Sequence, residues 1–244
     1  MKKCVMLLGL VAPMAAMAQD DEPVKPFSMD GEFGLIVTTG NTESSTMKAK
    51  LSAHQELEMW SNDFSLEGLY KQDEDDDTNK KETTAQNIYM AGQANYKLSN
   101  PNHRLFLFGS YEDDRFSSYN YQSTLALGWS ERLWETKKTK FEYSIGPGYA
   151  FVETDEDEDE SSVILRGSMD FHWKISESAN FSQLVSTEYG QYNTKSRSET
   201  ALTAKINGSL AMKLSLTMDH NSNVSSDTEK LDTTTAVTLV YTFF

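Results

Sequence analysis

The sequence has little of several residue types that carry recognisable chemistry. Cysteine occurs once in 244 residues, as Cys4 in the N-terminal segment, which excludes disulfides and cysteine chemistry from the chain after it. The four histidines show no H-x-x-x-H spacing, and no G-x-S-x-G motif is present. Apolar runs are also short, because none reaches the roughly 20 residues that a membrane-spanning helix needs.

Positive charge is scarce as well. The chain has 22 basic and 37 acidic residues, a net charge of −15. Removing Lys2 and Lys3 with the N-terminal segment leaves 20 basic residues against 37 acidic ones, a net charge of −17. Such a chain offers no basic patch to neutralise phosphates, so we expect no nucleic-acid partner.

The N-terminus is typical of an export signal. Lys2 and Lys3 precede the apolar stretch Cys4–Ala12, and Ala16–Ala18 forms an A-x-A cleavage site. We therefore expect a signal peptide over residues 1–18, a periplasmic lead over 19–29, and a membrane domain over 30–244.

What the chain does contain is a period of two along nearly its whole length. In Met47–Met59, apolar side chains at every second position alternate with lysine, serine, histidine and glutamate. Successive side chains of a strand point to opposite faces, so each such segment has one apolar and one polar face. The pieces are roughly ten residues long, which is enough for a tilted strand to cross a bilayer.

The connections between these pieces alternate between short turns and longer polar loops, as in outer-membrane barrels. We predict an all-β fold, a transmembrane antiparallel up-and-down β-barrel of about twelve strands in the outer membrane of a Gram-negative bacterium. A soluble β-sandwich, whose strands also alternate, is the alternative. The expected strands lie near 30–39, 47–59, 63–72, 84–98, 104–113, 121–133, 141–151, 163–175, 179–189, 200–210, 213–220 and 231–243.

Several local features refine this prediction. Leu105–Phe108 is apolar on both faces, so the direction of its side chains is ambiguous. Pro147 interrupts a regular strand and predicts a bulge or kink. Aromatic residues gather near the strand ends and predict two interfacial belts. The last strand ends on Phe243 and Phe244, which predicts recognition by the barrel assembly machinery.

Two segments carry a resemblance to a known family. Asp30–Leu35 (DGEFGL) followed by Thr39–Glu43 (TGNTE) resembles the opening of the salt-induced outer-membrane protein family, and Tyr111–Phe116 (YEDDRF) with Gly128 is also similar. The resemblance covers the chain from about residue 27. It implies an outer-membrane barrel and a link to salt, with no catalytic residue, metal or cofactor to carry over.

The polar faces of the strands supply the candidate functional residues. A mixture of both charge signs either lines a narrow water-filled pore or pairs up and plugs the barrel. Small inward residues such as Gly146, Gly148, Ser168 and Ser182 favour some open space. The lumen-facing candidates are Lys48, Lys50, Glu56, Glu67, Glu142, Arg166, Asp170, His172, Lys174 and Lys205.

Two acidic runs, Asp73–Asp77 and Asp155–Glu160, fall in expected loops. Oxygen-rich clusters suit calcium and magnesium, directly or as bridges to lipopolysaccharide, but such runs are more often simply solvated. We therefore predict no metal site, no cofactor and no enzymatic activity. The expected function is a narrow passive pore or envelope-stability protein linked to salt stress. A non-conducting structural barrel and a lipid-directed enzyme are the alternatives, and the oligomeric state is left open.

Overall fold

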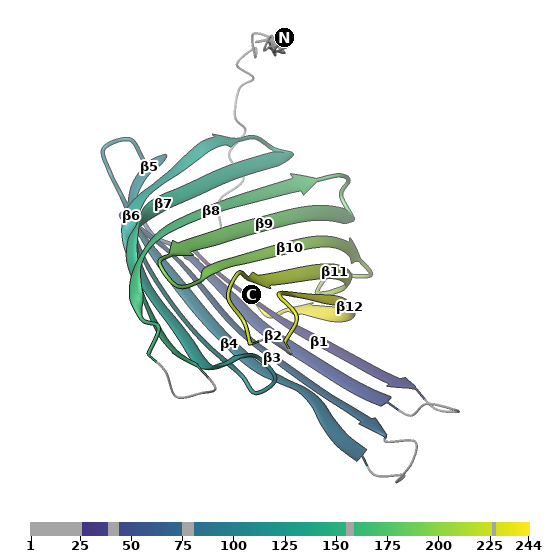
Figure 1. Ribbon diagram of the computed structural model, residues 1–244. Helices are drawn as coiled ribbons and strands as arrows, with labels where there is room; N and C mark the ends of the chain where they lie inside the picture. Colours follow the sequence, from purple (N-terminus) through teal and green to yellow (C-terminus); the bar gives the residue numbers. More distant parts are fainter. Residues whose placement is uncertain (1–25, 39–43, 75–80, 155–158, 226–227) are drawn as a thin grey trace, which may run out of the picture.

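A computed structural model describes residues 26–38, 44–74, 81–154, 159–225 and 228–244, and they form a closed antiparallel barrel of twelve strands (Figure 1). Each strand pairs with its neighbours in chain order, and β12 closes the barrel on β1. The predicted fold class is confirmed. The expected signal peptide lies outside the described residues. The strands are β1 Phe27–Thr38, β2 Ser44–Glu56, β3 Trp60–Glu74, β4 Lys81–Lys97, β5 His103–Asp114, β6 Tyr119–Glu135, β7 Thr139–Thr154, β8 Ser162–Lys174, β9 Ala179–Gly190, β10 Thr194–Lys205, β11 Leu210–Asn221 and β12 Leu231–Thr242.

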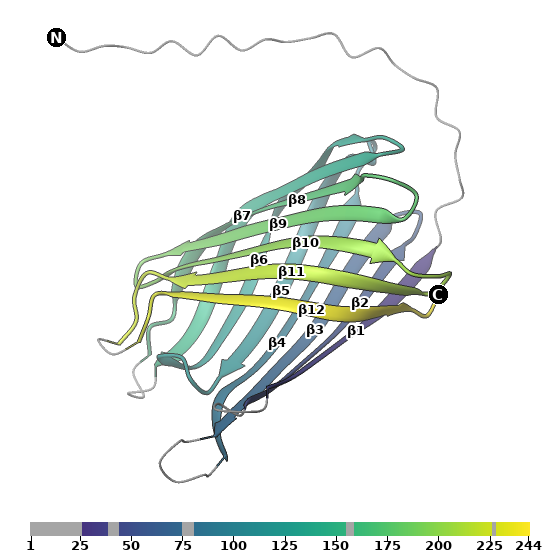
Figure 2. The same ribbon diagram turned by 90° about the vertical axis from the view of Figure 1, so that its right-hand side faces the viewer.

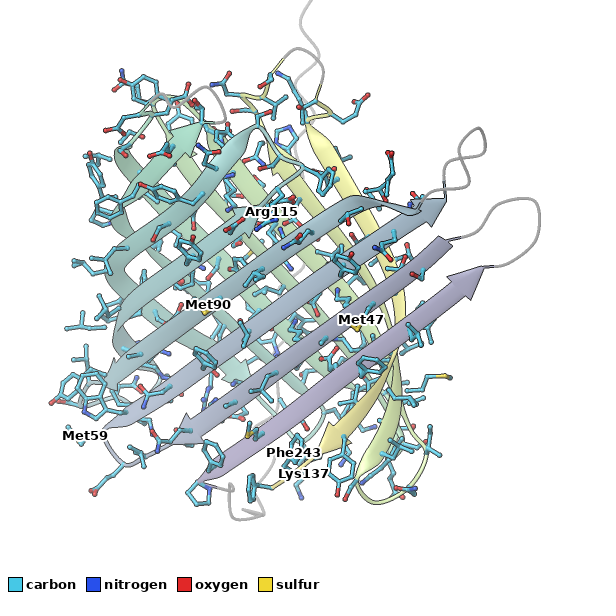
Figure 3. The ribbon with its side chains drawn as sticks, turned by 90° about the horizontal axis from the view of Figure 1, so that it is seen from below. Met47, Met59, Met90, Arg115, Lys137 and Phe243 are labelled. Atoms are coloured by element: carbon cyan, nitrogen blue, oxygen red, sulfur yellow. The ribbon has the colours of Figure 1, made fainter. Side chains whose placement is uncertain are left out.

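The outer surface of the barrel is apolar and the inner surface is polar. In β2, Met47 is 45% exposed and faces outward, whereas its neighbour Lys48 is 7% exposed and faces the lumen. Figure 3 shows Met47 and Met90 on the outside of β2 and β4. This arrangement inverts that of a soluble protein and matches a barrel surrounded by lipid. No helix in the described part of the chain is long and apolar enough to span a membrane.

The two ends of the barrel differ only in part. The connections at one end are all short, whereas those at the other end include the long one from Asn221 to Leu231 but also short turns from Asp114 to Tyr119 and from Gly190 to Thr194, where longer loops were expected. Short turns join β2 to β3, β4 to β5 and the later even-numbered strands to their successors, and β1 begins and β12 ends at this same end (Figure 2). We call it the turn end, and the opposite end the loop end. Aromatic pairs lie at both, with ring centroids of Trp60 and Tyr96 5.0 Å apart at the turn end and those of Tyr111 and Tyr121 6.3 Å apart at the loop end.

Strand β5 resolves the ambiguity in its sequence. Leu105 and Leu107 are 50% and 52% exposed on the outer surface, whereas Phe106 and Phe108 are 3% and 5% exposed inside the barrel. Both phenylalanines pack with Ala126 of β6. One wall of the lumen is therefore apolar, as a stretch that is apolar on both faces requires.

No bulge lies at Pro147, because it pairs in register with Leu165 of β8. On the β6 side, however, the ladder passes from Ala126–Gly148 to Trp129–Ile145 and leaves Gly146 and Pro147 without a β6 partner, so the expected loss of pairing at the proline is present. The register shifts of β6 and β7 lie at Tyr119/Tyr121 and Arg132/Trp134. Nearby, Gly128 and Gly146 allow an unusually close approach, since a Cβ on Gly146 would lie 2.1 Å from the carbonyl oxygen of Leu127. The inward glycine at 146 thus brings two strands together and does not widen the lumen.

Closure of the barrel relies on a short seam. β1 pairs with β2 along Phe27–Thr38, but with β12 through Asp30–Phe33 and Leu239–Thr242. The Phe243 amide extends the seam by donating to the Met29 carbonyl at 2.8 Å. The Phe243 ring also covers Gly31, where an added Cβ would lie 3.0 Å from the ring.

Candidate functional site

The lumen contains a cavity of about 410 Å³ in the half nearer the turn end. Nearly every strand contributes to its wall, with polar side chains at alternate positions, as the pleat requires. Serine hydroxyls, carboxylates, Arg166, Arg197 and the aromatic rings of Tyr89 and Phe108 line it. The volume lies within the range of pockets that hold small molecules.

A network of ion pairs lies at the inner boundary of this cavity. We call it the ionic lattice, and it consists of Glu32, Lys48, Lys50, Glu67, Arg197, Glu199, Lys213 and Asp219. Two of its contacts reach across from β10 to the first strands. Lys50 Nζ lies 2.8 Å from Glu199 Oε2, and Arg197 Nη2 lies 3.3 Å from Glu67 Oε2. Four cations face four anions, so the ionic lattice is electrically neutral.

The ionic lattice extends over a wall of small side chains. On β10, β11 and β12 the inward residues Ala201, Ser215, Ala236 and Thr238 are between 1% and 7% exposed. Small side chains leave room above them, and the long side chains of Lys50, Glu199 and the other lattice members fill it. Paired charges therefore occupy the lumen at this level.

Further contacts tie strands together on the loop side of the ionic lattice. Lys195 of β10 pairs with Glu112 of β5. Thr124 of β6 donates to Glu188 Oε2 of β9 at 2.7 Å. Since β5 and β10 lie on opposite sides of the barrel, the Lys195–Glu112 pair also crosses the lumen.

Asn223 and Ser225, in the described part of the connection between β11 and β12, contact other connections at the loop end. The Tyr119 hydroxyl donates to the Asn223 carbonyl, and the Ser225 amide donates to Ser118 Oγ at 2.9 Å. Asn223 Nδ2 also donates to both carboxylate oxygens of Glu160, at 3.1 and 3.2 Å. These contacts join connections from opposite sides of the barrel and narrow its outer opening.

Charged groups at the turn end are paired locally. Glu142 accepts contacts from three cations, with Arg132 Nε at 2.8 Å, Lys140 Nζ at 3.0 Å and Arg104 Nη1 at 3.1 Å. His172 Nε2 lies 3.0 Å from Asp170 and His54 Nδ1 lies 2.7 Å from Asp63. Both histidines therefore have a carboxylate partner on their own or a neighbouring strand.

The ten candidate residues occupy different positions in this arrangement. Lys174 and Lys205 lie at the turn ends of β8 and β10, exposed and outside the cavity. Lys48 and Glu56 join their neighbours through ion pairs, Lys48 with Glu67 and Glu56 with Lys97 and His54. The remaining six line the cavity: Lys50, Glu67, Glu142, Arg166, Asp170 and His172.

Several residues of the site were missing from the candidates, above all Lys195, Arg197 and Glu199 of β10. Their spacing of two was available in the sequence, but the outward positions between them, Ser196 and Ser198, are polar too. Without an apolar face, these residues were left in a connection between the expected strands 179–189 and 200–210. That placement is wrong, because β10 spans Thr194–Lys205 and therefore begins and ends earlier than expected. Outward polar groups of neighbouring strands form hydrogen bonds with one another, since Gln183 Nε2 of β9 donates to Ser198 Oγ at 3.0 Å.

The acidic runs Asp73–Asp77 and Asp155–Glu160 lie largely outside the described residues. Of their described members, Asp73 accepts from Lys71 Nζ at 2.7 Å, and Asp159 accepts from the Ser161 amide at 2.8 Å. The residues that the structure covers contain no group of three or more histidine, cysteine or acidic side chains that could hold a metal ion. Metal binding by the loops stays untested.

Comparison with known proteins places the chain in a family. The family described as "Protein of unknown function, DUF481" matches residues 31–243. The chain belongs to this family. The "Uncharacterized protein YdiY" of Escherichia coli (strain K12) is 25% identical over 245 residues, which cover 96% of this chain and 93% of that protein. Neither description carries a function, and the link to salt rests on the sequence resemblance.

Solved structures share the fold at low sequence identity. The COG4313 outer membrane channel from Pseudomonas putida F1 has a TM-score of 0.52 at 9% identity, over 94% of this chain and all 100% of that chain. The NanC porin has a TM-score of 0.51 at 11% identity, over 88% of this chain and 98% of that chain. The first is described as an outer membrane channel and the second as a porin, and at such identities the likeness concerns the fold alone.

Proposed function

We propose that this chain is an outer-membrane β-barrel of a Gram-negative bacterium that acts as a narrow, gated passage for small solutes. The apolar exterior and the fold shared with outer-membrane channels support the location. The observation that carries the passage is the cavity of about 410 Å³ that enters the barrel from the turn end and meets the ionic lattice. Within the described residues, a neutral set of paired side chains occupies the lumen and no folded plug does, so rearrangement of these side chains would widen the lumen at this level.

Planar-bilayer recording of the purified barrel tests this proposal. The wild-type protein should show small or infrequent conductance. The double variant K50Q/E199Q removes the Lys50–Glu199 contact without changing the net charge, and Lys213 keeps Glu32 as a partner at 2.9 Å. We expect this variant to conduct more than the wild type. The pair K71Q/D73N, which lies within β3, is the matched control and should behave like the wild type.

A non-conducting structural barrel is the second candidate. The contacts of Asn223 and Ser225 across the loop end favour it, because they narrow the opening independently of the ionic lattice. Absence of conductance in the wild type, in K50Q/E199Q and in a further variant with Asn223→Ala would support this candidate over a passage.

The proposed physiological role is envelope stability under salt stress, and it is supported by the resemblance of Asp30–Leu35 and Thr39–Glu43 to the salt-induced family. Outer-membrane lipid and lipopolysaccharide are its expected surroundings. A deletion strain that grows and retains periplasmic proteins normally at high salt would remove this part of the proposal.

A further inference from the structure

Arg166 differs from the other arginines of the lumen in how it is paired. Arg104, Arg132 and Arg197 each approach a carboxylate oxygen within 3.3 Å. Arg166 approaches Glu188 at 3.5 Å from Nε, and Nε has no hydrogen-bond partner among the described residues. Its Nη1 lies 3.5 Å from Ser144 Oγ, at the outer limit of a hydrogen bond.

This guanidinium is also buried and held in place. The Arg166 side chain is 7% exposed, and its Cζ lies 3.6 Å from the centroid of the Phe108 ring. Stacking on an aromatic face orients the planar guanidinium, so its N–H groups are directed before any ligand binds. A buried charge without short hydrogen bonds is costly, and an anion that supplies them is correspondingly favoured.

The surroundings of Arg166 are rich in hydroxyl groups. Ser144 Oγ and Ser168 Oγ are 2.7 Å apart, and both residues line the cavity together with Ser182 and Ser186. Each serine hydroxyl can rotate to donate or to accept, so this wall suits a ligand that carries hydroxyl groups itself. The rings of Phe108 and Tyr89 add apolar surface to the same cavity.

We propose that Arg166, with Ser144 and Ser168, forms a binding subsite for the carboxylate of a small polyhydroxylated acid, such as a sugar acid. The guanidinium fork matches a carboxylate with two parallel hydrogen bonds. Glu188, 3.5 Å from Arg166 Nε, repels any anion at this position, and it repels a doubly charged phosphate more strongly than a singly charged carboxylate. This subsite deepens the proposed function by naming the solute, and it rests on that function for its biological role.

Isothermal titration of the purified full-length barrel in detergent tests the subsite without requiring conductance. We expect glucuronate to bind and glucose, which lacks the carboxylate, to bind at least about tenfold more weakly. R166Q should weaken glucuronate binding by at least about tenfold, and R166K should also weaken it because lysine lacks the fork. R132Q is the matched control, since Arg132 lies outside the cavity wall, and it should bind like the wild type.

Equal binding of glucuronate and glucose, tighter binding of inorganic phosphate, or unchanged binding in R166Q would each overturn the subsite. If R166Q does not fold, F108A serves instead, because it removes the stacking partner and keeps the charge. The two proposals fail separately. Glucuronate binding without conductance removes the passage and keeps the subsite, and conductance without glucuronate binding does the reverse.

Discussion

Lys50 of β2 and Glu199 of β10 are 149 residues apart in the sequence, and their side chains meet at 2.8 Å across the lumen. Glu199 also accepts from Lys213 at 2.9 Å, so it is paired with two lysines at once. Substitutions at Glu199 therefore affect more than a single pair. The contact also places long charged side chains over the small residues of the β10–β12 wall.

Replacing Glu199 alone should be more damaging than replacing the pair. Glu199→Gln removes the shortest partner of Lys50 and one of the two equally close partners of Lys213, and we expect the free energy of unfolding to fall by about 2 to 3 kcal/mol. The double variant with Lys50→Met and Glu199→Met should recover part of this loss, because no charge remains unpaired. Urea unfolding in lipid vesicles, followed by tryptophan fluorescence, measures both.

The control for that experiment is Asp73→Asn. Lys71 and Asp73 form an ion pair of similar length, 2.7 Å, but both side chains are about a third or more exposed. An exposed pair contributes roughly 0–1 kcal/mol, so the effect should be small. Equal losses in Glu199→Gln and Asp73→Asn would show that the ionic lattice does not stabilise the barrel.

Gly146 should tolerate no side chain. A Cβ there would meet backbone atoms of Leu127 and Gly128 at 2.1 and 2.7 Å, and backbone cannot move aside as a flexible side chain can. We expect Gly146→Ala to cost about 2 kcal/mol or more, or to prevent folding. Gly68, where an added Cβ meets nothing within 4 Å, is the matched position. Folding yields of Gly146→Ala and Gly68→Ala that do not differ would contradict the close approach of β6 and β7.

The apolar outer surface predicts that the free-energy cost of a charged substitution depends on its depth in the membrane. Leu127, 60% exposed, lies near the middle of β6, and Leu231, 51% exposed, begins β12. Leu127→Arg should destabilise the barrel in vesicles by about 2–4 kcal/mol, and Leu231→Arg by about 0–1 kcal/mol, because a charge costs most at the bilayer centre. Similar values at the two positions would argue against a bilayer around this surface.

The two terminal phenylalanines should differ in assembly. Phe243 covers Gly31 and its amide pairs with β1, whereas Phe244 contacts Phe27 with ring centroids 5.8 Å apart. If the assembly machinery recognises the aromatic residue in phase with β12, Phe243→Ala should reduce the folded fraction in the outer membrane more than Phe244→Ala. Heat-modifiable migration on gels measures that fraction, and a larger defect in Phe244→Ala would reverse the assignment.

The sequence by itself determined that the chain forms a barrel. A strand must alternate, so Met47–Met59 identifies its lipid face without knowledge of any other strand. The same argument holds wherever outward residues are apolar, and it fails for β10, where Ser196, Ser198 and Thr200 lie outside among charged residues. It also fails for Leu105–Phe108, where both faces are apolar.

Only the tertiary structure decided how the lumen is filled. Which charges meet depends on the closure of β12 on β1 and on the register of every intervening pair, and these bring Lys50 to Glu199 and Arg197 to Glu67. Local periodicity contains no information about partners more than a hundred residues away. The loose pairing of Arg166 follows from the same long-range geometry, because its neighbours Phe108, Ser144 and Glu188 come from three other strands.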